Sequence, residues 1–366
     1  MNPKKKLRIA QIVSLEENVP PKSQNGLEFV ASWLTEGLVK RGHDVTLFAP
    51  DASVTSAKHV SILPEALWGD PKSVWWKPVR STWNTTVAAM RAKEFDVIHS
   101  HTWSIVFAAP FIQTPVVHTL HHPANHDSWC ALLNSIQNKE QLAPIAQVYN
   151  AIRNVAVSKR QKELFQANGG DFFFSQIDVI HNGIPTSLFM PHYEPGEYLL
   201  YLGYITPQKG AHLAIDIARR TGKKLTIAGN YVGQEEYFAA RIAPQLDDTI
   251  TYVGPADFEQ KTKLYQHAEA LLVPLQWDEP FGLTLVEAMA CGTPVIAFDR
   301  GAAKEIIEDG VTGFVCADID EACDALVKIP AIDRKKCRER AEKYFDVEAM
   351  LDAYEALYYS ILEKQK

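Results

Sequence analysis

Short apolar runs alternate with amphipathic segments along almost the whole chain. The apolar runs at 7–13 and 44–48 predict buried strands, and the segment 26–41 between them has the period of a helix. The apolar residues that mark this period are Leu27, Val30, Ala31, Leu34 and Leu38. Because two strands joined through a helix pair in parallel, this part of the chain predicts a β-α-β unit.

The same rhythm continues through the rest of the sequence. Further strands are expected at 96–99, 115–119, 154–157, 178–180, 198–202, 224–228, 250–253, 272–275 and 294–298. Helices are expected at 211–219, 235–246, 261–268, 283–290 and 347–363. This alternation predicts an α/β fold class with a Rossmann-like, doubly wound parallel sheet in each half of the chain.

The boundary between the two halves is predicted from turn residues. Asn182-Gly183-Ile184-Pro185 and the stretch 191–196 together form the densest turn-rich segment, which places the boundary near 182–196. We therefore expect an N-terminal domain at 1–181 and a C-terminal domain at 182–346. The chain then ends in the expected helix at 347–363, within a final segment 347–366.

Composition restricts the class of protein without identifying it. The 366 residues are 46% hydrophobic, enough for two cores, and contain no run of eighteen apolar residues and no apolar leader. A net charge of −7 argues against a nucleic-acid-binding protein. Five scattered cysteines without Cys-x-x-Cys spacing indicate reduced thiols. Together these features predict a cytoplasmic enzyme.

The most informative stretch is 278–295, which reads DEPFGLTLVEAMACGTPV. A turn at Phe281-Gly282 leaves the backbone N–H groups of Leu283 and Thr284 unpaired at the start of a helix, and such a helix N-terminus favours an anion such as a diphosphate. Glu279 precedes the turn and Glu287 lies on the helix, so two carboxylates bracket the expected anion site. Carboxylates accept hydrogen bonds from the hydroxyl groups that a sugar and a ribose present on either side of a diphosphate.

This stretch resembles the Glu-x7-Glu signature of the retaining glycosyltransferases of family four. The resemblance implies a GT-B fold, in which two Rossmann-like domains face each other across a cleft. It further implies that the C-terminal domain binds a nucleotide-sugar donor, that the N-terminal domain holds the acceptor, and that the segment 347–366 packs back on the N-terminal domain. The expected chemistry is transfer of a sugar to an acceptor hydroxyl with retention.

The resemblance extends to the turn after the strand at 198–202. Gly203, Tyr204 and Lys209 lie in this turn, where a lysine at the carboxyl end of a parallel sheet can hold a phosphate. Members of the family usually carry an arginine at the position of Tyr204. The tyrosine therefore leaves open a second hypothesis, a nucleotide-sugar-binding protein with weak or no transfer activity. Arg300 and Lys304 are the cations that would compensate.

Two positions in the N-terminal half also match the family. Gly26 corresponds to a glycine beside the donor phosphate, with Asn25 in place of a second glycine, and His121 corresponds to a residue that contacts the transferred sugar. His101 ends a neighbouring strand, so it is a further candidate for the same cleft. Six histidines lie between positions 99 and 126, but without a His-Glu-x-x-His pattern or a ligand at suitable spacing, so no metal site is predicted.

The tryptophans in segment 68–83 alternate with basic residues. Packing on their own domain is the plainer interpretation, while stacking on an acceptor sugar or contact with the inner face of a membrane remains open.

The expected partners are a nucleoside-diphosphate-sugar, with UDP before GDP, and a carbohydrate, lipid-linked or small-molecule acceptor, with no nucleic acid. We expect no cofactor and no metal, because the leaving phosphate itself can take the acceptor proton and no Asp-x-Asp motif is present. A GT-B phosphorylase or a sugar-nucleotide epimerase is a further alternative, without a sequence mark of its own. A dinucleotide-dependent enzyme is disfavoured because Gly-x-Gly-x-x-Gly is absent from both first turns.

Overall fold

The computed structural model describes residues 5–21, 26–63, 66, 77–123, 140 and 143–364. The chain divides into two compact units. The first unit contains Met1–Gly183 and Val347–Lys366, and the second contains Ile184–Asp346. The sequence-based domains, 1–181 with 347–366 and 182–346, differ from these units by two residues at one boundary.

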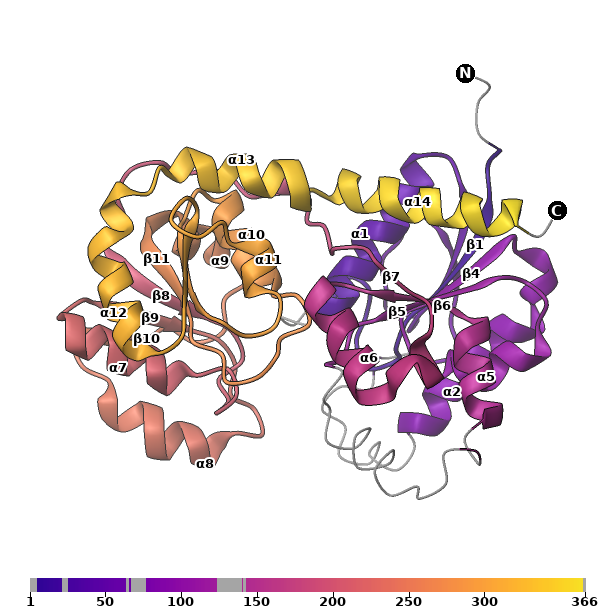
Figure 1. Ribbon diagram of the computed structural model, residues 1–366, viewed down its shortest axis with the longest axis horizontal. Helices are drawn as coiled ribbons and strands as arrows, with labels where there is room; N and C mark the ends of the chain where they lie inside the picture. Colours follow the sequence, from indigo (N-terminus) through magenta and orange to yellow (C-terminus); the bar gives the residue numbers. More distant parts are fainter. Residues whose placement is uncertain are drawn as a thin grey trace. The chain divides into compact units, whose positions relative to one another are not determined.

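The first unit is built on a seven-stranded sheet in which all strand pairs are parallel (Figure 1). Its strands are β1 (Arg8–Ile12), β2 (Asp44–Phe48), β3 (Lys58–Val60), β4 (Val97–Ser100), β5 (Val116–Leu120), β6 (Arg153–Ala156) and β7 (Ile177–Val179). Their spatial order is β3-β2-β1-β4-β5-β6-β7. The direction of winding therefore reverses between β1 and β4, and in such sheets ligands bind outside the carboxyl ends of the strands at this point.

Helices cover both faces of this sheet. One face packs on α2 (Lys77–Met90), α3 (Ile105–Ala108), α5 (Ala143–Ala151) and α6 (Lys159–Phe174), which share an apolar core with alternate strand residues. On the other face, α1 (Gly26–Lys40) packs against α14 (Val347–Glu363), the last helix of the chain (Figure 1). Gly37 permits this contact, because a Cβ at that position would lie 2.4 Å from Leu351 Cδ1.

Charged and aromatic side chains hold α14 against the rest of the first unit. Arg41, just after α1, pairs with three carboxylates of α14, at Glu348 (2.5 Å), Asp352 (2.7 Å) and Glu355 (2.5 Å). The inner side of α14 buries Tyr354 and Tyr358. The last helix of the chain therefore packs against α1 within the first unit.

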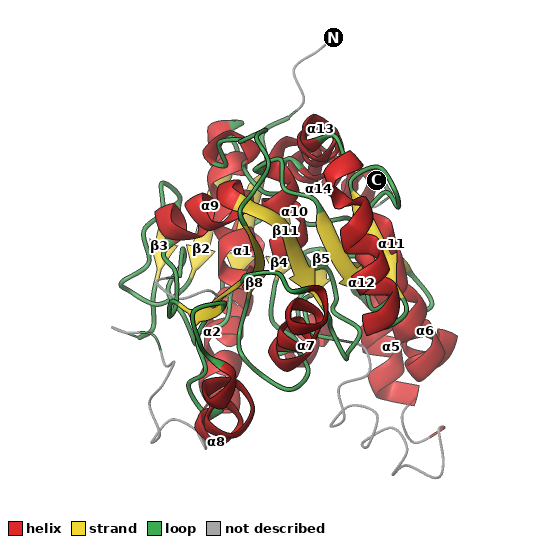
Figure 2. Ribbon diagram, turned by 90° about the vertical axis from the view of Figure 1, so that its left-hand side faces the viewer, coloured by secondary structure: helices red, strands yellow, loops and turns green. Residues whose placement is uncertain are grey.

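The second unit is a smaller version of the same architecture, with strands enclosed by helices (Figure 2). Its parallel strands are β8 (Tyr198–Leu202), β9 (Leu225–Ala228), β10 (Ile250–Tyr252), β11 (Ala268–Val273), β12 (Val295–Phe298) and β13 (Gly313–Cys316), in the order β10-β9-β8-β11-β12-β13. Its main helices are α7 (Ala211–Thr221), α9 (Phe258–His267), α10 (Leu283–Ala290), α12 (Ile319–Lys328) and α13 (Arg334–Phe345), with the short α11 (Ala303–Ile306). Winding reverses between β8 and β11, so the loops that follow these two strands lie at the ligand-binding position of a doubly wound sheet.

One predicted helix of the second unit differs from the structure. The segment 235–246 consists of α8 (Glu235–Tyr237), a π-helical stretch (Phe238–Ile242) and a 3-10 turn (Ala243–Gln245) rather than one α-helix. Pro244 lies in the last of these and has no backbone N–H to continue an α-helical ladder.

Candidate active site

The turn between β11 and α10 has the conformation that an anion site requires. Gly282 precedes the helix with a φ of +99°, a left-handed conformation that a glycine adopts without strain. The helix begins at Leu283, and the N–H groups of Leu283 and Thr284 have no hydrogen-bond partner within the described part of the chain. Phe281 is buried and packs edge-on against Phe345, which fixes the turn from behind.

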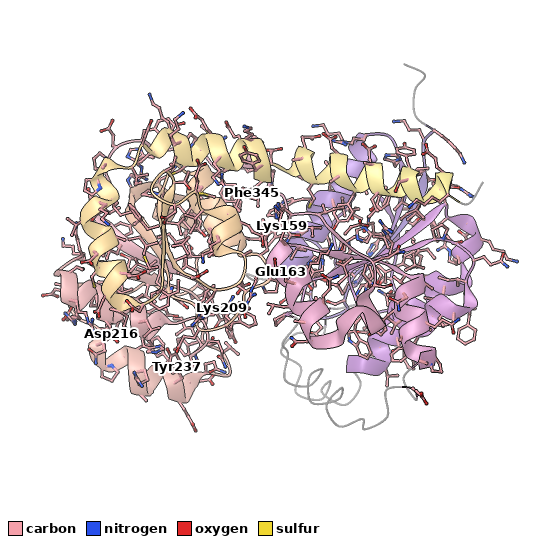
Figure 3. All side chains as sticks on the ribbon, in the orientation of Figure 1. Lys159, Glu163, Lys209, Asp216, Tyr237 and Phe345 are labelled. Atoms are coloured by element: carbon pink, nitrogen blue, oxygen red, sulfur yellow. The ribbon has the colours of Figure 1, made fainter. Side chains whose placement is uncertain are left out.

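The loop after β8 lies against this turn. Gly210, with a φ of +78°, approaches the backbone so closely that a Cβ would lie 2.1 Å from the carbonyl oxygen of Pro274. The backbone N–H of Gln276 donates to the carbonyl of Gln208 at 2.8 Å, which joins the two loops. As a result the ammonium group of Lys209 forms an ion pair with the carboxylate of Glu279. Figure 3 labels Lys209 among the side chains of the second unit.

Lys209 and Glu279 therefore form an ion pair next to the turn that begins α10, since a Cβ at Gly282 would lie 3.8 Å from Glu279 Cγ. The Lys209 ammonium also lies 4.9 Å from the ring centre of Trp277, a cation–π contact. The backbone of Glu279 is held in turn, because its carbonyl accepts from the N–H of Ala302 at 3.2 Å. Both side chains of the ion pair remain partly exposed, 29% for Lys209 and 20% for Glu279, so a ligand can reach them.

Glu287 lies one turn further along α10 in a more enclosed environment. Its carboxylate accepts from Lys261 Nζ at 2.6 Å and from the hydroxyl of Tyr265 at 2.9 Å, both on α9. The side chains of Glu287 and Lys261 are only 5% and 11% exposed. Each carboxylate oxygen still has a further lone pair, so this arrangement orients Glu287 without exhausting its capacity as an acceptor.

Tyr204 is held by the protein rather than extended into solvent. Its hydroxyl donates to the carbonyl of Val232, and its own carbonyl accepts from the hydroxyl of Tyr201 at 3.0 Å. Gly203 continues β8 by donating to the carbonyl of Ala228 at 3.0 Å. The position where the family usually has an arginine is thus occupied by a tyrosine that braces the loop after β9.

The two cations considered as substitutes are both exposed. Lys304 Nζ pairs with Asp299 at 2.5 Å, and Arg300 donates to the carbonyl of Asp299 at 3.1 Å. Nothing in these contacts directs either side chain to the Lys209–Glu279 pair.

In the first unit, polar side chains gather where β1, β4 and β5 end. His121 Nε2 lies 2.9 Å from His101 Nδ1, and His101 Nε2 lies 2.9 Å from Gln11 Oε1. Burial lowers the pKa of His101 and of His121 well below the ordinary value, and neighbouring histidines lower both further. These imidazoles are therefore neutral at physiological pH.

Gly26 is the first residue of α1, whereas Asn25 lies outside the described residues. Within the first turn, Glu28 is 4% exposed and accepts from the hydroxyl of Ser14 at 3.0 Å. Burial raises the pKa of Glu28 to about 7. A titrating carboxyl at the carboxyl end of β1 was not among the residues predicted from the sequence.

The predicted site residues consequently form two groups. Gly26 and His121 belong to the first unit, and all the others belong to the second.

Among the described residues, no group of three or more histidine, cysteine, aspartate or glutamate side chains is placed to hold a metal ion. No described helix has the length and apolar character needed to cross a membrane. Of the aromatic segment, Trp68, Trp75 and Trp76 lie outside the described residues, and Trp83 on α2 is 52% exposed.

Two family models together cover most of the chain. The model described as Glycosyltransferase Family 4 matches residues 24–188, and the model described as Glycosyl transferases group 1 matches residues 190–344. The chain belongs to glycosyltransferase family four. It is therefore a nucleotide-sugar-dependent glycosyltransferase of a retaining family, as the Glu-x7-Glu signature predicts.

Relatives and solved structures agree with this assignment. The glycogen synthase of Mycobacterium tuberculosis (strain CDC 1551 / Oshkosh) is 26% identical over 396 aligned residues, covering 95% of this glycosyltransferase and 94% of that protein. The sucrose-phosphate synthase of Thermosynechococcus elongatus has a TM-score of 0.76 at 19% identity, covering 98% of this chain and 100% of that one. HepE of Anabaena, solved with UDP-glucose, has a TM-score of 0.70 at 19% identity, covering 97% and 100%. The predicted GT-B fold class is thereby confirmed.

Sequence reasoning missed the partners that hold this glycosyltransferase's site residues. Lys261 and Tyr265 are one helical turn apart on α9, and both reach Glu287, which lies 26 and 22 residues further along the chain. The spacing of Lys261 and Tyr265 places them on one helix face, but only the packing of α9 on α10 identifies their common partner.

Proposed function

We propose that this glycosyltransferase moves a hexose from a UDP-sugar to a hydroxyl group of a carbohydrate, lipid-linked or small-molecule acceptor, with retention and without a metal ion. The observation that carries the proposal is the ion pair of Lys209 with Glu279 beside the turn that begins α10, where the N–H groups of Leu283 and Thr284 have no hydrogen-bond partner among the described residues. A cation beside a helix N-terminus suits a diphosphate that gains negative charge as the sugar departs.

The second unit is the proposed donor side. Lys209, with the N–H groups of Leu283 and Thr284, binds the diphosphate, while Glu279 accepts from sugar hydroxyls and positions Lys209. Glu287, oriented by Lys261 and Tyr265, accepts from the ribose hydroxyls. The bond between the anomeric carbon and the phosphate oxygen breaks, the acceptor oxygen bonds to the same face of that carbon, and the acceptor proton passes to the leaving phosphate.

The first unit is the proposed acceptor side. His121 contacts the transferred sugar and Gly26 lets the backbone approach the donor phosphate, both by resemblance to the family. UDP-glucose is the first donor to test, because HepE was solved with that molecule and has the same fold.

Tyr204 supports the second candidate, a protein that binds the donor without efficient transfer. Its hydroxyl is engaged by the Val232 carbonyl, so it brings no charge to the diphosphate. If the donor binds but no nucleoside diphosphate is released with any acceptor of a broad panel, this second candidate replaces the first.

The proposed function is tested by calorimetry with UDP, GDP and ADP and their sugars. We expect UDP to bind and Glu287→Gln to weaken it by about 1–3 kcal/mol, the range for a lost charge-assisted hydrogen bond. Glu269→Gln is the matched control, since Glu269 pairs with Lys223 at 2.6 Å in the same unit. Unchanged affinity in Glu287→Gln removes this residue from the donor site.

Loss of the buried ion pair needs its own control. Lys261→Met leaves Glu287 in place but removes its cation, so it disturbs the pair without removing the proposed ribose ligand. We expect Lys261→Met to retain more UDP affinity than Glu287→Gln. Equal losses would mean that the ion pair shapes the site and that Glu287 does not contact the nucleotide.

A further inference from the structure

A chain of three polar side chains crosses the carboxyl end of the first sheet. Gln11 lies on β1, His101 follows β4 and His121 follows β5, so three neighbouring strands each supply one member. Gln11 is 0% exposed and His101 is 2% exposed, and the two contacts that join the chain are both 2.9 Å. A buried polar chain of this kind can have only one consistent arrangement of protons at a time.

The direction of this chain follows from the amide oxygen of Gln11. An oxygen can only accept, so His101 Nε2 must carry the proton of the contact with Gln11. Because His101 is neutral, its Nδ1 then has a lone pair and must accept from His121 Nε2–H. His121 is neutral as well, so its Nδ1 has no proton. This nitrogen has no hydrogen-bond partner among the residues that the structure describes.

The orientation of the Gln11 amide rests on the 2.9 Å contact of its oxygen with His101 Nε2. The other end of the amide, Nε2, is buried and has no hydrogen-bond partner among the described residues. Tyr358 of α14 lies 2.7 Å from Nδ1 of the neighbouring His99 and bonds to that ring.

We propose that Gln11 is a positioning residue which, through His101, holds His121 in the Nε2–H tautomer and so presents His121 Nδ1 as a hydrogen-bond acceptor for a substrate hydroxyl. The functional part of this inference rests on the proposed contact of His121 with the transferred sugar. The tautomer itself does not, because Gln11 and His101 determine it within the protein.

The inference is tested first by the nitrogen NMR spectrum of the full chain labelled with 15N-histidine, at pH 8. Protonated and unprotonated imidazole nitrogens have well-separated 15N shifts, and the spectrum of His121→Gln identifies the signals of His121. We expect His121 with a protonated Nε2 and an unprotonated Nδ1. If His121 of the wild-type protein has the opposite tautomer or a fully protonated ring, the proposal is wrong, and no variant is needed to show it.

Variants then test the role of Gln11. Gln11→Leu removes the oxygen that orders the chain, so the His121 signals should move toward a mixture of tautomers. Gln11→Glu keeps an acceptor beside His101 Nε2 and should preserve the wild-type tautomer. Thr119→Val is the matched control, because Thr119 is equally buried and bonds to His99 at 2.7 Å but lies outside the chain from Gln11 to His121. If Gln11→Leu leaves the His121 signals unchanged, Gln11 does not set the tautomer.

Measurements of turnover distinguish a failure of this inference from a failure of the proposed function. We expect Gln11→Leu to lower kcat by about tenfold, the effect of one hydrogen bond, with Gln11→Glu restoring most of it. If His121→Ala itself leaves turnover unchanged, the proposed contact of His121 with the sugar is wrong, and the tautomer result still decides the role of Gln11. If His121→Ala abolishes turnover but Gln11→Leu shifts the tautomer without changing kcat, the acceptor role of Nδ1 is refuted.

Discussion

Glu28 should make the first unit less stable as the pH rises through neutrality. Its carboxyl group is buried in the first turn of α1, with one hydrogen bond from Ser14. Burial is the main reason that its pKa is raised to about 7, and the nearby Glu17 and Glu16 raise it further. A hydrogen bond from the backbone and the one from Ser14 oppose this shift but do not cancel it.

The size of the effect follows from the two pKa values. The folded state prefers the protonated carboxyl, with a pKa of about 7 against an ordinary value of 4.5. This contribution to stability is complete below pH 4.5 and is lost as the pH rises through 7. At roughly 1.4 kcal/mol for each pH unit between the two pKa values, the loss approaches about 3 kcal/mol by pH 8.

The assay is urea unfolding of wild type and Glu28→Gln at pH 5, 6, 7 and 8. Trp277 is the one tryptophan between residues 184 and 346, so tryptophan fluorescence reports mainly on the first unit. We expect the free energy of unfolding to fall with pH in wild type more steeply than in Glu28→Gln, with the variant more stable at pH 8 by up to about 3 kcal/mol.

Ser14→Ala provides a second variant with an opposite expectation. It removes a hydrogen bond that lowers the pKa of Glu28, so the stability loss should become larger. Parallel pH profiles for wild type and Glu28→Gln would refute the reasoning, because they would mean that Glu28 titrates alike in the folded and unfolded protein.

Three further predictions concern transfer. In steady-state assays, Lys209→Ala should lower kcat by about a hundredfold and affect KM less, because the negative charge that Lys209 meets is greatest in the transition state. Lys304 is an exposed lysine paired with Asp299, so the control Lys304→Ala should change neither kcat nor KM. EDTA should leave turnover unchanged, and activity lost with EDTA but restored by a divalent ion would contradict the proposed metal independence. Tyr204→Arg should tighten donor binding in calorimetry by adding a cation; weaker binding would mean that the Tyr204 contact with Val232 supports the site.

The sequence predicts the elements that carry several signals at once. The strand at 198–202 and the helices at 283–290 and 347–363 have the bounds of β8, α10 and α14 in the structure. For α10, an apolar period coincides with a glycine at each end, so local conformation and burial favour the same element.

Elements with a weaker apolar pattern were not predicted. The helix α13 reads RKKCRERAEKYF, in which charged residues hide the buried positions Cys337, Ala341 and Phe345. The apolar pattern predicts that α9 starts at 261, whereas the helix begins at Phe258 behind a capping box formed by Asp257 and Gln260. That signal was present in the sequence, since Asp257 precedes Gln260 by three residues.

Features of the candidate site can be predicted from the sequence where they are local, and cannot where they depend on contacts between distant residues. The turn at Gly282 is local, so the helix-terminal N–H groups after it follow from the sequence. The pairing of Lys209 with Glu279 joins residues 70 apart and depends on two loops meeting at the switch point of the second sheet. The burial of Glu28 could not be inferred, because an acidic residue in a first helical turn is ordinarily a solvated partner of the helix dipole.

The two groups of site residues differ in charge, and this difference bears on which substrate each receives. In the second unit, Glu279 and Glu287 each pair with a lysine, so cations are held in place beside a helix N-terminus. In the described part of the first unit, no lysine or arginine forms an ion pair with Glu28, and His101 and His121 are kept neutral by burial. A diphosphate requires fixed positive charge, whereas a hydroxyl requires an acceptor that is already desolvated and oriented. This charge distribution, rather than the fold that both units share, supports the proposed placement of the donor in the second unit and of the acceptor in the first.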